Sequence, residues 1–293
     1  MTRAGRADLL VADAGELCEG PCWDQRTGTL VWVDILAGAV HVLDPRTAEH
    51  RTHRLQMPVG AVAPRRGGGW VAAVERGFLF LDDGWQPTGA VLAAPGQPPG
   101  TRFNDGACDP HGDFWAGTLA YDGTPRVAAL YRLGADGCVS EVLSGVTNSN
   151  GIAWSPDGAT MYYVDTGLGT VDKFDVDPVT GTVTGRATLI RIAEGDGLPD
   201  GLTVDADGHL WLALWGGGCV RRYTPSGELE AVVELPVALV TSVAFGGNEL
   251  DDLYITTARQ GLTPSQQRAQ PLAGSIFRYR PGTRGIPVAS FAG

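Results

Sequence analysis

Long apolar runs are absent from this chain of 293 residues. No segment has the apolar length of a signal peptide or a membrane span. Basic residues are also in the minority, since 22 Lys and Arg against 33 Asp and Glu give a formal net charge of −11. This balance disfavours nucleic acid and anionic membranes as partners. We therefore expect a cytoplasmic protein, a monomer or weak dimer, with no nucleic-acid or membrane partner.

Several catalytic and metal-binding motifs are missing as well. The five cysteines are odd in number and form no CxxC pair, so we expect reduced packing residues. The five histidines show no metal-ligand spacing, and we expect them to face solvent. No Gly-x-Ser-x-Gly motif occurs, which disfavours a lactonase or esterase with a serine nucleophile. The glycine run 216–218 lacks the Lys-Ser/Thr of a phosphate-binding loop.

Helix signals are scarce, whereas strand signals recur along the whole chain. A helix is predicted only around residues 262–269, where Thr263 is a candidate cap and Pro264 suits the first turn. Elsewhere short runs of β-branched and aromatic residues end in Asp-Gly and Pro turns. Six such runs are marked by anchor residues that lie 39, 44, 48, 48 and 43 positions apart: Trp32, Val71, Trp115, Tyr163, Trp211 and Tyr254.

These spacings each suit one four-stranded blade. The chain is therefore predicted to be all-β: a six-bladed β-propeller with four-stranded blades around a central channel. No stretch has the composition of a linker, so we expect residues 1–293 to form a single domain.

Polar residues followed by glycine recur about a dozen residues before most anchors. Four of the six repeats carry a carboxylate or carboxamide there: Glu19-Gly20, Asp105-Gly106 with Asn104 before it, Asn150-Gly151 and Asp200-Gly201. The innermost strand of each blade lines the channel, so equivalent positions should converge. Oxygen ligands without sulfur or imidazole suit a hard cation. We expect one divalent ion, with Ca²⁺ as the preferred candidate and Mg²⁺, Mn²⁺, Zn²⁺ or Fe²⁺ as alternatives.

A turn-forming role is the alternative for each residue taken alone, because Asp and Asn before Gly are common in turns. Their shared register across the repeats favours a common site instead. Asp34 and Asp165 directly follow anchor runs, and for these two we expect a structural role as acceptors that hold turns.

The ordered motifs closely resemble the gluconolactonase and regucalcin (senescence marker protein) family. The resemblance covers nearly the whole chain. It is carried by Glu19-Gly20-Pro21-Cys22-Trp23, Arg102-Phe103-Asn104-Asp105-Gly106, Phe114-Trp115-Ala116-Gly117-Thr118, Ser149-Asn150-Gly151, Pro199-Asp200-Gly201 and Phe245-Gly246-Gly247, and by a closing segment at 270–277.

This resemblance implies a propeller that hydrolyses sugar-derived lactones with one divalent metal. It implies Glu19, Asn150 and Asp200 as the metal ligands. Substrate contacts are implied for Arg102, Asn104 and Asp122. Around Asp122 the sequence Ala-Tyr-Asp-Gly departs from the family's doubly acidic form, so the sugar stays open.

The chemistry of such a site can be derived from the residue types. An ion with open positions polarises a lactone carbonyl and stabilises the oxyanion. Asp200 is our candidate general base for the attacking water. The expected substrate is a glucono-, xylono-, arabino- or galactonolactone. Two alternatives stay open: hydrolysis of another ester or a phosphotriester on the same scaffold, and a non-enzymatic calcium-binding regulatory propeller.

Overall fold

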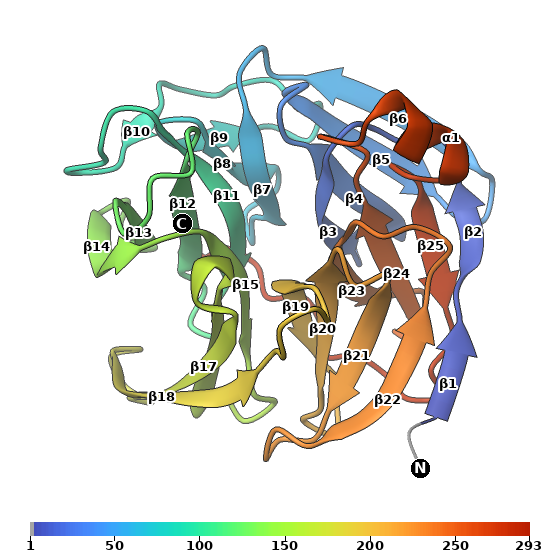
Figure 1. Ribbon diagram of the computed structural model, residues 1–293. Coiled ribbons are helices and arrows are strands. Elements are labelled where there is room, and N and C mark those ends of the chain that lie inside the picture. Colours follow the sequence, from blue (N-terminus) through green and yellow to red (C-terminus); the bar gives the residue numbers. More distant parts are fainter. Residues whose placement is uncertain (1–2) are drawn as a thin grey trace.

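The computed structural model describes residues 3–293 and is nearly all-β. Six sheets stand in a ring around a central channel, as Figure 1 shows, which confirms the predicted six-bladed propeller. The first four blades run outward in sequence order as antiparallel strands, and in the fifth and sixth the N-terminal strands β1 and β2 are added at the outer edge. The six inner strands β3, β7, β11, β15, β19 and β23 therefore surround the channel.

The first three blades follow one another directly. The first contains β3 (Cys18–Asp24), β4 (Thr29–Asp34), β5 (Ala39–Asp44) and β6 (Glu49–Arg54). The second contains β7 (Val59–Pro64), β8 (Trp70–Val74), β9 (Gly77–Leu81) and β10 (Leu92–Ala93). The third contains β11 (Thr101–Cys108), β12 (Phe114–Ala120), β13 (Ala128–Leu133) and β14 (Val139–Val146).

The last three blades include both ends of the chain. The fourth contains β15 (Ser149–Trp154), β16 (Thr160–Asp165), β17 (Thr170–Val176) and β18 (Val183–Arg191). The fifth contains β19 (Leu198–Val204), β20 (Leu210–Trp215), β21 (Cys219–Tyr223), β22 (Leu229–Glu234) and, parallel to β22, β1 (Arg3–Arg6). The sixth contains β23 (Val240–Gly246), β24 (Asp252–Thr257), β25 (Ile276–Tyr279) and β2 (Asp8–Val11).

The N-terminal strand β2 closes the ring, because it supplies the outermost strand of the sixth blade. The 3-10 helix η1 (Thr166–Leu168) and the helix α1 (Pro264–Ala269) lie in connections between strands. Thr263 caps α1, and its hydroxyl accepts a hydrogen bond from Gln266 N. This confirms the one helix predicted from the sequence and its capping residue.

The six anchor residues form the centre of the blades' packing. Each lies on the second strand of its blade and is at most 2% exposed. Strands such as β4 and β20 are buried along nearly their whole length, since neighbouring blades cover both faces. This burial explains why strict alternation of apolar and polar residues is weak in the sequence.

The histidine expectation was wrong for His41. Its ring is buried and stacks on Trp32, with ring centroids 5.1 Å apart. His41 Nδ1 lies 3.1 Å from His50 Nε2. The stacking contact with Trp32 on the neighbouring strand β4 accounts for the buried position of His41, and the sequence spacing alone did not show this contact.

The cysteines are all unpaired in the structure, and four of them are buried.

The C-terminal segment crosses the end of the channel at which the inner strands finish. Gly285 N donates to Leu250 O, and Phe291 N donates to Pro64 O, each at 2.8 Å. Pro64 is the last residue of inner strand β7.

None of the helices in residues 3–293 is long and apolar enough to cross a membrane.

Candidate functional site

The predicted polar residues of the inner strands lie together in the channel. Glu19 on β3, Asn150 on β15 and Asp200 on β19 are each 3% exposed, and Asn104 on β11 is 5% exposed. Asn104 Nδ2 donates a hydrogen bond to Asn150 Oδ1 at 3.1 Å. The charge of Glu19 also raises the pKa of Asp200. Residues from four blades thus form one buried cluster.

Glycines beside these residues allow the inner strands to approach closely. A Cβ on Gly151 would lie 2.6 Å from Leu202 N, and one on Gly60 would lie 2.8 Å from Asn104 N. On Gly201 it would lie 2.1 Å from Ser242 Oγ. Any larger residue would push neighbouring blades apart. The recurring glycines are therefore a packing requirement of the ring and bring the polar residues before them together.

Asp34 and Asp165 fix the segments that lead into two of the inner strands. Asp34 Oδ2 accepts from Glu16 N at 2.9 Å, just before β3. Asp165 accepts from Thr147 N at 3.1 Å and Asn148 N at 3.0 Å, just before β15. The structure confirms the structural role expected for both carboxylates, which hold the strand starts that carry Glu19 and Asn150.

Three buried carboxyl groups of the inner strands affect one another's charge: Glu19, Asp105 and Asp200. Burial and the charge of Asp105 raise the pKa of Glu19 well above its usual range. Burial, Glu19 and Asp105 do the same for the pKa of Asp200. Burial raises the pKa of Asp105 to about 6. Asp200 Oδ1 is buried without a hydrogen-bond partner. Buried anions without partners are costly, so a bound cation would relieve the repulsion.

The orientation of the Asn150 amide follows from its partners. Thr166 Oγ1 donates its proton to Pro199 O at 2.8 Å. It must therefore accept from Asn150, whose Nδ2 lies 2.8 Å away. This leaves Asn150 Oδ1 on the side of Asn104. Thr166 lies outside the inner strands, so reasoning from the repeats missed it, and no sequence signal distinguished it.

Arg102 is a buried cation next to these acids. It is 5% exposed, and its Nη1 donates to Asn104 Oδ1 at 2.8 Å and to Phe103 O at 2.9 Å. Arg102 Nε has no hydrogen-bond partner within residues 3–293. Burial lowers the pKa of Arg102, while Tyr121 and Glu19 act to raise it. The Arg102 guanidinium therefore keeps an N–H donor that a ligand oxygen could accept from.

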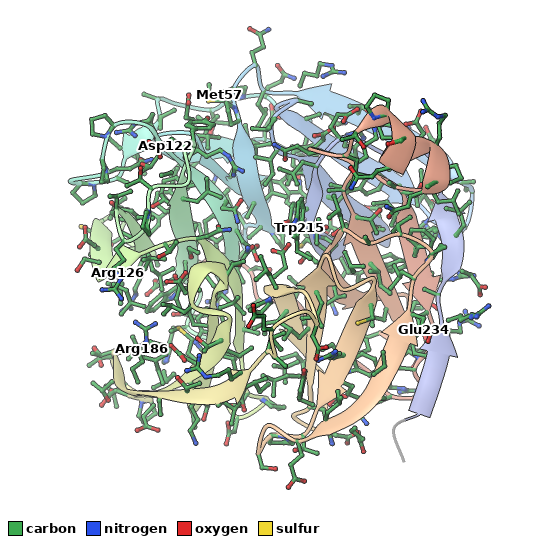
Figure 2. All side chains as sticks on the ribbon, viewed as in Figure 1. Met57, Asp122, Arg126, Arg186, Trp215 and Glu234 are labelled. Carbon is green, nitrogen blue, oxygen red and sulfur yellow. The ribbon has the colours of Figure 1, made fainter. Side chains whose placement is uncertain are left out.

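Asp122 lies outside the buried cluster. It is exposed on the connection after β12, where its Oδ1 accepts from Thr124 N at 2.9 Å. Figure 2 shows Asp122 among the outer loops, whereas Trp215 lies nearer the middle of the ring. The neighbouring Tyr121, which sequence reasoning did not single out, has its ring centroid 5.9 Å from Arg102 Cζ.

The donor set suits a hard divalent cation. Within residues 3–293 no three His, Cys, Asp or Glu side chains gather closely enough to hold a metal ion by themselves. A metal site here would need the amide oxygen of Asn150 in addition to the carboxylates of Glu19 and Asp200. Carboxylate and amide oxygens are ligands that Ca²⁺ and Mg²⁺ accept. The unpartnered Asp200 Oδ1 is consistent with an ion at this point.

A cavity of about 380 Å³ occupies the channel beyond Asp105. Its walls come from the later parts of all six inner strands, and residues 286–289 of the C-terminal segment cover its far end. Its lining includes Cys22, Ile152, Trp154 and Leu202, which are apolar.

The structure belongs to the class of six-bladed propellers, and buried carboxylate and amide side chains gather in its channel. Residues 17–259 match the family described as SMP-30/Gluconolactonase/LRE-like region. The chain belongs to this family, as the sequence resemblance implied.

Relatives of the chain extend over almost its whole length. The Bacillus subtilis (strain 168) protein named "Putative sugar lactone lactonase YvrE" is 36% identical over 279 residues, 94% of each chain. Regucalcin of Danio rerio is 37% identical over 293 residues, 98% of this chain and 99% of that protein. The solved structure of a calcium-binding protein, regucalcin, from Agrobacterium tumefaciens strain C58 has a TM-score of 0.91 and 29% identity, and 99% of each chain is covered.

Proposed function

We propose that this protein hydrolyses a sugar-derived lactone to the aldonic acid and uses one divalent metal ion, for which Ca²⁺ is the preferred candidate. Family membership and the relative named as a sugar lactone lactonase support the reaction class. The observation that carries the proposal is the cluster of buried carboxylates beside a buried Arg102 with an unfilled donor. A structural ion site alone has no use for such a guanidinium.

Glu19, Asn150 and Asp200 would hold the ion. When bound, it would supply Lewis-acid polarisation of the lactone carbonyl and relieve the repulsion between the carboxylates. Glu19 and Asp200 bring negative charge, and the fixed amide of Asn150 brings a neutral oxygen. This mixture of ligands also suits Mg²⁺, Mn²⁺, Zn²⁺ or Fe²⁺ to differing degrees.

Arg102, Asn104 and Asp122 would bind the substrate. Arg102 has free donors for a carbonyl or hydroxyl oxygen, and Asn104 is fixed by its bonds to Arg102 and Asn150. Asp122 would accept hydroxyl protons of a polyhydroxylated ring from the exposed loop, where its Oδ1 also accepts from Thr124 N. These roles favour a hydroxylated lactone over an apolar ester.

Asp200 is the proposed general base. One of its carboxylate oxygens would bind the ion, and the other would receive a proton from the attacking water. The water oxygen then forms a bond to the carbonyl carbon, the bond from that carbon to the ring oxygen breaks, and the ring oxygen gains the proton that Asp200 received. The product is an open-chain aldonic acid. A reactive ester needs no stronger base, whereas an amide would.

A second candidate is a calcium-binding protein without enzymatic activity. The calcium-binding regucalcin structure with 29% identity favours it, because the same oxygen cluster would serve there. The two candidates differ in what they require of Arg102: an ion site gains nothing from a cation in the same cluster. Metal binding without turnover on any lactone or ester would favour the second candidate.

The test is acid release, followed in a pH-stat, from a panel of glucono-, xylono-, arabino- and galactonolactones. Metal-stripped protein is compared with protein given each of the five ions. Asp200→Asn is the matched variant, and Asp136→Asn, in an exposed turn, is its control. We expect hydrolysis that depends on added metal, a loss of at least about 100-fold in Asp200→Asn and no loss in the control. Full activity of metal-loaded Asp200→Asn would overturn the base assignment.

A further inference from the structure

Tyr121 reaches from the third blade to the second across the start of β11. It follows the last residue of β12, and its backbone N donates to Gly100 O at 2.9 Å. Its hydroxyl donates to Glu75 Oε1 at 2.9 Å, in the turn between β8 and β9. Burial and the bond to Glu75 raise the pKa of Tyr121 to about 12. The phenol thus stays protonated at neutral pH and keeps this bond.

The ring of Tyr121 is one contact away from the proposed substrate groups. Its centroid lies 5.9 Å from Arg102 Cζ. Arg102 donates to Asn104 Oδ1 at 2.8 Å, and Asn104 donates to Asn150 Oδ1 at 3.1 Å. A continuous chain of contacts therefore runs from the aromatic ring to a proposed metal ligand. A molecule that fills the free donor of Arg102 would lie within reach of the ring.

Packing of the protein itself does not account for this aromatic side chain. Tyr121 is 49% exposed, although its ring is held at two points. It belongs to none of the apolar clusters between the blades in residues 3–293. An exposed but fixed ring beside a buried polar site offers an apolar face to a ligand. One face of a sugar ring presents C–H bonds, which the polar residues of the cluster cannot bind.

We propose that Tyr121 determines specificity by packing its ring against the C–H face of the bound lactone while Glu75 fixes its orientation. This inference rests on the proposed lactonase function and adds a residue to it. Arg102 and Asn104 would recognise the oxygens of the substrate, and Tyr121 would recognise the ring itself. The matching substrate class is a six-membered, polyhydroxylated aldonolactone that offers a broad C–H face.

The test compares Tyr121→Ala and Tyr121→Phe with the wild type on D-glucono-1,5-lactone, each with saturating Ca²⁺. We expect Tyr121→Ala to raise KM about 5- to 10-fold with kcat within about 2-fold, because ground-state and transition-state packing are lost together. Tyr121→Phe keeps the ring and should stay within about 3-fold of the wild-type KM. Val127→Ala, on the same connection and 37% exposed, is the matched control and should leave both constants unchanged.

A direct binding measurement separates this role from a structural one. Calorimetric titration of D-gluconate into the Ca²⁺-loaded protein should show weaker binding in Tyr121→Ala, while the urea unfolding midpoint stays that of the wild type. A lowered midpoint with unchanged gluconate binding would show a structural residue and overturn the proposal. If the wild type turns over the lactone and Tyr121→Ala has the same KM, the role of Tyr121 is overturned while the lactonase function stands. Absence of turnover in the wild type would overturn the lactonase function, and this proposal with it.

Discussion

The Asn150 side chain donates to Thr166 Oγ1 at 2.8 Å, and this one bond fixes which atom of the amide faces the channel. Thr166 in turn donates to Pro199 O, the carbonyl just before Asp200. One hydroxyl thereby joins β15 to β19 and orients two proposed metal ligands from different blades. The geometry of the candidate site thus depends on a residue that would not touch the ion.

Removal of this hydroxyl should loosen the ion site. We expect Thr166→Val to weaken Ca²⁺ binding about 10- to 100-fold, because Asn150 Nδ2 and Pro199 O would both lose a buried partner. Thr166→Ser keeps the hydroxyl and should bind Ca²⁺ nearly as the wild type does. Calorimetric titration of the metal-stripped proteins measures both. Equal affinity of the valine and serine variants would contradict the role assigned to Thr166.

Asp200→Asn should have opposite effects with and without metal. In chelator the variant should be more stable than the wild type by about 1–3 kcal/mol, because one of three mutually repelling buried carboxylates is gone. With Ca²⁺ the wild type should be the more stable of the two. A free Ca²⁺ concentration of 100 times Kd stabilises the wild type by about 2.7 kcal/mol and stabilises the variant less. Thermal unfolding in chelator and in Ca²⁺ checks this. A variant less stable than the wild type in both conditions would indicate a structural carboxylate.

Asp205, which directly follows β19, has a structural role. Its Oδ2 accepts from Trp211 Nε1 at 3.0 Å and from Arg222 Nη2 at 2.8 Å, and the residue is fully buried. Asp109 makes the equivalent bond to Trp115 in the third blade, at 2.8 Å. We expect Asp205→Ala to cost at least about 1–3 kcal/mol in urea unfolding, since Trp211 Nε1 loses its buried acceptor and Arg222 keeps only Glu230 as a carboxylate partner. Its Ca²⁺ affinity, measured by titration, should stay within about 2-fold of the wild type.

His41 should make the protein less stable in acid. Burial, and next the charge of His50, lower the pKa of His41 to about 4 from an ordinary value near 6.5. Between these values the unfolded chain binds the proton and the folded one does not, so stability falls as pH falls from about 6.5 to about 4. The loss amounts to about 2–3 kcal/mol at most.

His41→Phe keeps a ring on Trp32 but cannot titrate. Urea unfolding of this variant at pH 7 and pH 5 should show a smaller loss in acid than the wild type shows. His111→Gln, at an exposed position, should behave as the wild type. The same acid loss in His41→Phe would mean that other groups cause it.

The fold was predictable because the signal repeats. Six anchors at similar spacing required six similar sheets, and the buried second strands confirm each anchor. Closure of the ring by β2 was not predictable, because a short N-terminal strand such as Asp8–Val11 carries no repeat signal. Its pairing with β25 is decided only when the ring closes.

The sequence predicted those site residues that occupy equivalent positions on the inner strands. Glu19, Asn104, Asn150 and Asp200 were predicted to converge, and the structure brings them into one cluster. Residues that reach the cluster from connections between strands could not be identified from the repeats. Thr166 and Tyr121 lie in connections after second strands, and only the contacts of the folded chain reveal their partners.

The most direct test of the account is a comparison of two Ca²⁺ titrations on the same metal-stripped protein. One follows ion binding by calorimetry, and the other follows hydrolysis of D-glucono-1,5-lactone. We expect activity to appear with the same midpoint as binding and at one ion per chain. Hydrolysis that persists unchanged in chelator, or an ion that binds tightly while no lactone is turned over, would contradict the central claim that this channel site is a metal-dependent lactonase.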